Sequence, residues 1–165
     1  MNYVTGLFKD KESAENAYRL ASQSGYSDSD INVIMSEETR EKYYGKNATL
    51  ETEVGSKLAE GAAIGGTVGG TIGAIAAGVA AIGTALVLPG LGIWVAGPLA
   101  AAVAGAGAGG VAGGLVGALV GWGIPEDTLK QYEENVKQGD ILIGINPKSI
   151  EDRQRFESNW NPTNT

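Results

Sequence analysis

The fold depends on an apolar stretch that begins GAAIGGTVGGTIGAIAAGVAAIG at residues 61–83 and continues to Pro125. No Asp, Glu, Lys, Arg, Asn or Gln occurs within it, although the chain carries 19 Asp+Glu and 12 Lys+Arg. Most of the 26 glycines also lie inside this stretch. The chain therefore divides into a polar flank, an apolar middle and a second polar flank.

The composition excludes several classes of function. The 165-residue chain contains no His and no Cys, which excludes Ser-His-Asp and Cys-His nucleophile systems, zinc sites built from thiolates or imidazoles, and disulfides. Its formal net charge of −7 argues against a nucleic-acid partner, because phosphate binding depends on clustered Lys and Arg. We therefore expect a protein that is not an enzyme, with no cofactor, no metal and no small-molecule substrate.

Glycine recurs every four residues at both ends of the apolar middle. We expect the following glycines to make helix–helix contacts: Gly61, Gly65, Gly69 and Gly73, and then Gly105, Gly109, Gly113, Gly117 and Gly121. A period of four keeps small residues on one face of a helix, where a second helix can approach to backbone contact. The sequence therefore predicts a glycine zipper.

A turn signal separates the two glycine rows. Pro89 and Gly90 favour a turn, and Pro98 suits the first turn of a helix. We expect a helical hairpin over about 57–86 and 98–122, with helices long enough to cross a bilayer.

Two settings for this hairpin stay open. In the first, it lies in the inner membrane in contact with lipid, with both termini in the cytoplasm because all Lys and Arg lie in the flanks. In the second, hairpins from several chains pack together in a cytoplasmic homo-oligomer. Both settings make a second copy of the chain its partner.

The first flank has the pattern of strand, helix, strand. Residues 3–8 suit a strand, and Asp10 is a candidate N-cap. Gly25 fits the position after a helix that needs a positive φ, before a second strand at 31–35 and a helical turn at 37–45. The expected apolar face of the helix comprises Ala14, Ala17, Tyr18 and Ala21.

The second flank has the pattern of helix, strand, helix. Pro125 suits the first position of a helix that Gly139 ends, and Glu133 and Glu134 on it are expected to be solvated. Residues 141–145 are nearly all apolar, as in a central strand covered on both faces. Ser149 and Asp152 form a candidate capping box for a last helix, whose expected apolar residues are Ile150, Phe156 and Trp160.

Neither flank alone offers enough strands and helices to bury a core. We therefore expect one α+β domain split by the insert: residues 1–54 as its first half, 55–122 as the zipper hairpin and 123–165 as its second half with the C-terminal helix. Its three strands would carry helices on one face. Two independent stubs are the alternative.

The flanks also resemble a bacterial family. Residues 4–8, 13–17 and 25–26, and in the second flank 123–126 and 139–143, resemble the two halves of the domain of YflT-like general stress proteins. The resemblance covers roughly 1–45 and 123–157 and implies a ferredoxin-like domain associated with stress response, without an established enzymatic site. Together with the zipper, it leads us to expect a non-enzymatic, stress-associated protein that self-associates.

Overall fold

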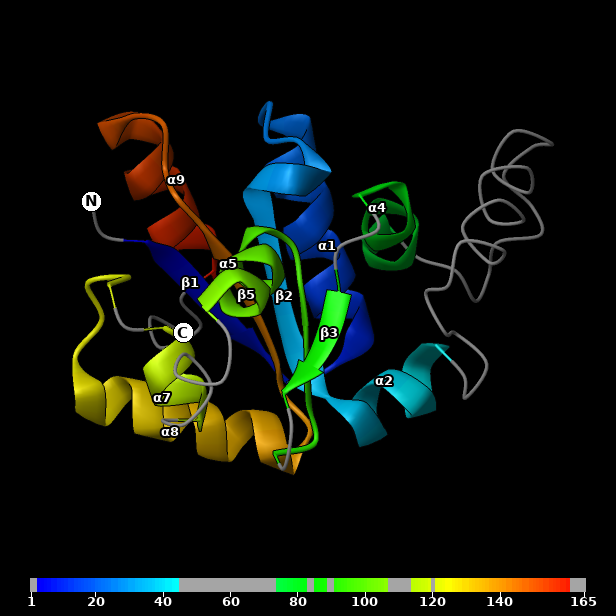
Figure 1. Ribbon diagram of the computed structural model, residues 1–165. Helices are drawn as coiled ribbons and strands as arrows, with labels where there is room; N and C mark the ends of the chain where they lie inside the picture. The colour runs from blue at the N-terminus through cyan, green and yellow to red at the C-terminus, as the bar shows by residue number, and fades with distance from the viewer. Residues whose placement is uncertain are drawn as a thin grey trace, which may run out of the picture.

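A five-stranded antiparallel sheet in the order β1-β5-β2-β4-β3 forms the centre of the computed structural model (Figure 1). In chain order its strands are Val4–Phe8 (β1), Ile31–Ser36 (β2), Ala85–Leu88 (β3), Ile93–Ala96 (β4) and Ile141–Ile145 (β5). The structure describes residues 3–44, 74–82, 85–88, 91–106, 114–119 and 121–160. The fold is thus of the α+β class, as expected.

The two flanks share this sheet. β5 of the second flank lies between β1 and β2 of the first, with Phe8 opposite Ile141 and Val33 opposite Ile143. All five residues of β5 are buried, because the strand has neighbours on both edges and apolar layers on both faces. Strands from both flanks therefore belong to one sheet.

Helices cover both faces of the sheet, which corrects the expectation of helices on one face. One apolar layer contains α1 (Lys11–Gln23), α4 (Ala74–Ile82) and α9 (Ile150–Trp160). The opposite layer contains α5 (Pro98–Ala106), α7 (Gly114–Ala118) and α8 (Glu126–Gln138). Two faces need cover because Ile141, Ile143 and Ile145 project into the first layer and Leu142 into the second.

The connection between the two expected long helices differs from the expectation. It is largely a β-hairpin, in which β3 pairs with β4 and β4 pairs with β2. The physical reason is that Ile93 and Val95 fill one apolar layer while Trp94 fills the other, so the segment buries both faces as a central strand. A turn is present before Ile93, but it joins strands rather than helices.

The helices in the described parts of the two expected long helices are short: α4 in the first, and α5 and α7 in the second. Ala85 and Leu86, which the sequence predicts at the end of the first helix, belong to β3. Residues 57–73, 83–84, 107–113 and 120 of the expected helices lie outside the described residues. Within the part of the chain that is described, no helix combines the length and the apolar character that crossing a membrane requires.

Local signals in the flanks are confirmed with two adjustments. Asp10 Oδ1 accepts a hydrogen bond from Ser13 N at 2.7 Å, and the φ of Gly25 is +89°. Ser149 Oγ accepts from Asp152 N at 3.0 Å, although Ile150 is 72% exposed instead of packed. Pro125 immediately precedes α8, one residue before its predicted place. The described residues also include the short helices η1 (Asp28–Asp30) and α2 (Glu37–Tyr44).

Truncating the core side chain of α9 tests the packing of the second flank against the first. Phe156 is fully buried, with its ring 5.4 Å from that of Tyr26 and 4.8 Å from that of Trp160. Phe156→Ala should lower the free energy of unfolding by about 3–5 kcal/mol in urea denaturation. The control Ile150→Ala, on the exposed side of the same helix, should stay within about 0.5 kcal/mol. Equal losses would contradict this packing.

Candidate self-association surface

Each described helix of the apolar middle takes an N-terminal cap from a flank. In all three helices, the N–H of the second helical residue donates to a side-chain oxygen that lies far away in sequence. The bonds are Ile75 N to Glu15 Oε2 at 3.2 Å for α4, Leu99 N to Asn32 Oδ1 at 2.7 Å for α5, and Leu115 N to Glu133 Oε2 at 3.0 Å for α7.

The apolar middle has few means of capping its own helices. Glycine precedes each of the three helices in the sequence, and no Asp, Asn or Ser occurs between residues 61 and 125. The first N–H groups of a helix have no partner within it, and the side-chain oxygens of those residue types are the usual partners. The flanks supply the missing oxygens, and in doing so they fix where each helix starts.

Glu15 joins α1, α2 and α4. Its side chain is buried, and its Oε1 accepts a hydrogen bond from the Tyr44 hydroxyl at 2.7 Å. Burial, followed by the bond to this carboxylate, raises the pKa of Tyr44 well above its usual value, so the hydroxyl remains a neutral donor. Further along α4, Gly78 lies directly against the Tyr18 hydroxyl, and a Cβ there would collide with it. Glycine at this position therefore lets α4 pack closely on α1.

Asn32 joins β2, β5 and α5. It is 1% exposed, and its Nδ2 donates to the Gly144 carbonyl oxygen at 3.2 Å while Oδ1 caps α5. The chain enters α5 through Gly97, which has a φ of +96° and lies so close to the Ile31 carbonyl oxygen that a Cβ would clash. α5 is therefore anchored to the centre of the sheet by its first turn.

Glu133 joins α8 to α7. Its Oε1 accepts from Lys137 Nζ at 2.8 Å, and its Oε2 accepts the α7 bond. Burial raises the pKa of the Glu133 carboxyl, but the Lys137 ammonium and the Leu115 and Val116 amides outweigh it, so the pKa lies below its usual value. The expectation that Glu133 is simply solvated is therefore wrong, since its charged form has a structural partner.

Three of the predicted zipper glycines lie in the described residues, and they occupy different environments. Gly105 is exposed on α5, Gly117 is half-buried on α7, and Gly121 follows the end of α7 with a φ of +97°. The left-handed conformation of Gly121 explains why it is not helical, contrary to the expected helix over 98–122. The other zipper positions lie outside the described residues: Gly61, Gly65, Gly69, Gly73, Gly109 and Gly113.

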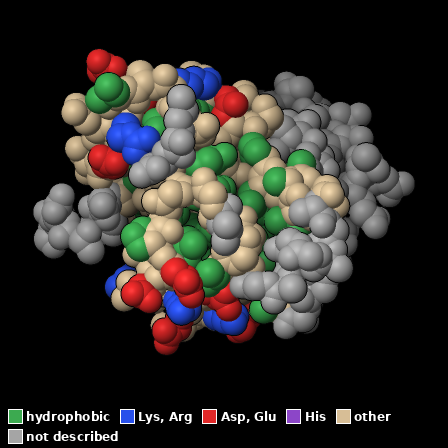
Figure 2. Space-filling model, turned by 60° about the vertical axis from the view of Figure 1, so that its left-hand side comes forward, with side chains coloured by type: hydrophobic (Ala, Val, Ile, Leu, Met, Phe, Trp, Pro, Cys, Tyr) green, Lys and Arg blue, Asp and Glu red, His purple; other side chains and the backbone are tan. Residues whose placement is uncertain are grey.

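The outer side of α5 presents small side chains to solvent. Leu99, Ala100 and Val103 are buried against the sheet. The exposed residues, which we call the α5 face, are Ala101, Ala102, Ala104 and Gly105. A Cβ added at Gly105 would meet no atom within 4 Å. In the view of Figure 2, charged side chains gather along the bottom, over α8, and near the top, and the band between them shows hydrophobic and uncharged atoms.

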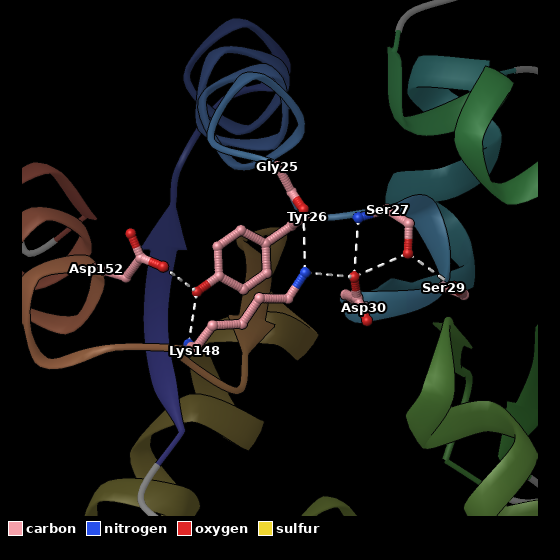
Figure 3. Close-up of polar contacts among 7 residues, drawn as sticks. All are labelled: Gly25, Tyr26, Ser27, Ser29, Asp30, Lys148 and Asp152. Carbon is pink, nitrogen blue, oxygen red and sulfur yellow. Dashed lines mark hydrogen bonds and ion pairs between the residues drawn. The ribbon is translucent and has the colours of Figure 1, made fainter.

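A polar cluster links the flanks on another part of the surface (Figure 3). The Tyr26 hydroxyl donates to Asp152 Oδ2 at 2.8 Å and accepts from Lys148 N at 2.8 Å. The Lys148 ammonium lies over the Tyr26 ring, donates to the Gly25 carbonyl oxygen at 3.0 Å and pairs with Asp30 at 3.2 Å. Burial and the Asp152 bond raise the pKa of Tyr26, despite the opposing Lys148 amide. The hydroxyl therefore keeps its proton and donates to Asp152, and the cluster acts as a structural link.

Two surface cavities offer no clear chemistry of their own. One of about 450 Å³ lies between β1, α8 and α9, where Thr5 Oγ1 and the Tyr132 hydroxyl are 3.0 Å apart. Another of about 700 Å³ lies between α7 and α8 and includes Gly117. Its cations already pair with neighbouring carboxylates on α8, Lys130 with Glu126 and Lys137 with Glu133, each at 2.8 Å.

Comparisons with protein-family models, with curated proteins and with solved structures return no match. The function is therefore argued from the residues and their arrangement.

Sequence reasoning missed the three capping residues, although each left a signal. Asn32 interrupts an otherwise apolar strand between Ile31 and Val33, and Glu15 directly follows Ala14 of the expected apolar face of the helix. The sequence signal for Glu133 is weaker, because an i,i+4 pair with Lys137 is typical of a solvated helix surface. The informative signal is the scarcity of capping side chains in the apolar middle, where glycine precedes each of the three helices, so that their caps must come from elsewhere.

Removing the Asn32 cap should destabilise the domain. Asn32→Ala leaves the buried Leu99 N–H without its acceptor, which costs about 1–3 kcal/mol of unfolding free energy. The control Asn16→Ala removes an exposed amide from α1 and should change stability by less than about 0.5 kcal/mol. Hydrogen exchange at the Leu99 amide reports the same bond directly, and unchanged protection in Asn32→Ala would count against the cap.

The Glu133 cap should make stability depend on pH. Folding lowers the pKa of the Glu133 carboxyl, so the charged carboxylate stabilises the folded state at pH values above 4.5, the ordinary pKa of a glutamate. This contribution is lost as the pH falls through the lower pKa that the carboxyl has in the folded state. Glu133→Gln should therefore be less stable than the wild type at pH 7, and the difference should shrink below pH 4.5. Glu134→Gln, on the exposed side of α8, is the control for charge. A difference that does not change with pH would refute this role.

Proposed function

We propose that this protein is a non-enzymatic assembly protein whose partner is a second copy of itself, and that the copies meet at the α5 face. The observation that carries the proposal is the exposure of four small residues on a helix whose opposite side is anchored in the core. Small side chains allow two helices to approach closely, and such contacts favour self-association.

The distribution of charge supports the same surface. Each copy has a formal net charge of −7, so two copies repel each other through their flanks. α5 belongs to the charge-free stretch, so no charge on α5 has to be desolvated when two such helices meet. A contact there therefore avoids the main electrostatic penalty of bringing two acidic chains together.

The pairing of β4 with β2 favours a protein-packed assembly over the membrane hairpin. A hairpin that crosses a bilayer places its tip on the far side of the membrane. Here the residues expected at the tip, 86–98, include a strand that is hydrogen-bonded to a strand of the first flank. The end of α4 and the start of α5 therefore both lie next to the sheet.

The finer description of the fold belongs to this proposal as well. A ferredoxin-like domain split by the glycine-zipper segment is supported by the position of β5 between β1 and β2. A role in stress response is supported by the resemblance of the flanks to YflT-like proteins alone.

Adding a large side chain to the α5 face should weaken self-association without unfolding the protein. Gly105→Leu places its side chain in open space, so the folded chain should tolerate it. A clash between two copies costs about 1–3 kcal/mol, which raises the dissociation constant by about five- to 150-fold. Light scattering over a dilution series measures this change.

The matched control is Gln131→Leu, which adds a leucine to the exposed side of α8 and should leave the dissociation constant unchanged. A wild-type chain that stays at 16.9 kDa at all concentrations would refute the proposal. So would flotation of the chain with lipid vesicles together with a monomeric mass in buffer, because that result would support the membrane setting.

A further inference from the structure

The cavity between β1, α8 and α9 lies at the β1 end of the sheet. β1 pairs with β5 alone among the described strands, and α8 and α9 cover opposite faces of the sheet beside it. Its described lining residues form no catalytic pair, but its volume of about 450 Å³ lies within the range of about 300–1,000 Å³ that is typical of small-molecule sites. The polar and aromatic side chains that line it are Tyr3, Thr5, Tyr132, Gln154, Glu157 and Ser158.

Three of these lining residues carry aliphatic or phenolic hydroxyl groups. Thr5 Oγ1 and the Tyr132 hydroxyl lie 3.0 Å apart, and the hydrogen bond between them uses one of their two hydrogens. Ser158 Oγ donates its hydrogen to the Gln154 carbonyl oxygen at 2.8 Å and keeps its lone pairs as acceptors. The three hydroxyls therefore retain one donor and several acceptors for a ligand.

Two exposed side chains of α9 add further donors and acceptors. The Gln154 side-chain amide has two N–H donors and a carbonyl oxygen, and it forms no hydrogen bond within the described part of the chain. Glu157 pairs with Arg153 at 3.8 Å, a separation that leaves its carboxylate oxygens able to accept other hydrogen bonds. The cavity therefore offers donors and acceptors side by side.

This mixture of groups selects a class of ligand. Glu157 is the one charged side chain among the described lining residues, so a phosphate or carboxylate ligand would meet no cation there. A single carboxylate is too few for a divalent cation. An added β-strand is disfavoured because Tyr3 N already donates to the Trp122 carbonyl oxygen at 2.9 Å. A neutral sugar matches the lining, since each of its hydroxyls both donates and accepts.

Tyr3 contributes an aromatic wall that is fixed in place. Its ring stacks on the Trp122 ring with the centroids 4.1 Å apart and the planes 6° from parallel. Trp122 in turn lies directly over Gly144 of β5, where a Cβ would collide with the indole. The C–H groups of a sugar ring can contact such an apolar ring surface. Because the wall is already ordered, less conformational entropy is lost when a ligand binds.

We propose that this cavity binds a neutral sugar of one or two rings, which Thr5, Tyr132 and Gln154 hold by hydrogen bonds beside the Tyr3 ring. The site goes beyond the proposed self-association. β1 and β3 are the two ends of the sheet order and α5 packs over β3 and β4, so a contact at the α5 face leaves the cavity accessible. The site also joins the two flanks, since β1 belongs to the first and α8 and α9 to the second.

Titration of the isotope-labelled full chain with glucose, mannose and maltose, followed by NMR, tests the site. At least one of these sugars, at millimolar concentration, should shift the amide signals of Thr5, Tyr132 and Gln154 saturably, while the signal of Gly105 on α5 stays in place. Millimolar sugar is too dilute for the general stabilisation that excluded sugars exert at high concentration. The absence of a saturable shift with all three sugars would overturn the proposal.

Two variants each remove one group that contacts the sugar. Tyr132→Phe keeps the ring and loses the hydroxyl, and Gln154→Ala loses an exposed amide, so both should fold. Each should raise the dissociation constant of the sugar about five- to tenfold. The matched control Gln131→Ala removes an exposed amide of α8 that does not line the cavity and should leave the constant unchanged. Equal effects of Gln131→Ala and Gln154→Ala would contradict the site.

A different class of ligand gives a distinguishable result. Choline carries a cation of the kind that a carboxylate and tyrosine rings bind. Shifts of the same amide signals with choline, and none with the sugars, would overturn the sugar as the ligand and assign the cavity to a cation. Self-association is measured separately by the dilution series with Gly105→Leu, so either proposal can fail without the other.

Discussion

The structure depends on hydrogen bonds from the flanks to the starts of the helices in the apolar middle. Glu15, Asn32 and Glu133 each satisfy an N–H that the middle has no Asp, Asn or Ser to satisfy. An unpaired N–H in a buried position is costly, so each helix is stable only where a flank offers an oxygen. The apolar middle and the flanks therefore depend on each other to fold, although their compositions differ sharply.

The same dependence explains why the sheet includes strands from all three parts of the chain. The flanks contribute β1, β2 and β5, and the middle adds β4 and β3 beside β2. Asn32 lies on β2 and caps α5, and α5 begins two residues after β4 ends. One residue of a flank strand therefore helps to fix the helix that follows the neighbouring strand, and the middle is held at the sheet by both backbone pairing and a side-chain cap.

Much of the flanks was predictable because their signals are local. Asp10, Gly25, Gly139 and Ser149 each act within a few residues, and apolar spacing identified the buried side of α1. The middle was harder because a period of four in glycine is compatible with several roles. Gly78 permits close packing, Gly97 has a positive φ against the sheet, and Gly105 faces open space. These roles depend on what lies opposite each glycine, which the sequence does not state.

Confining all charge to the flanks has a consequence for how two copies can meet. The flanks carry all the charge of an acidic chain, and charges of one sign repel, so the flanks of two copies would repel each other. The uncharged strand β3 and the α5 face lie outside the flanks and adjoin each other through the packing of α5 on β3. If two copies meet as proposed, repulsion over the flanks and contact at the uncharged α5 face together favour association through one surface of the chain, because every charged surface belongs to the flanks.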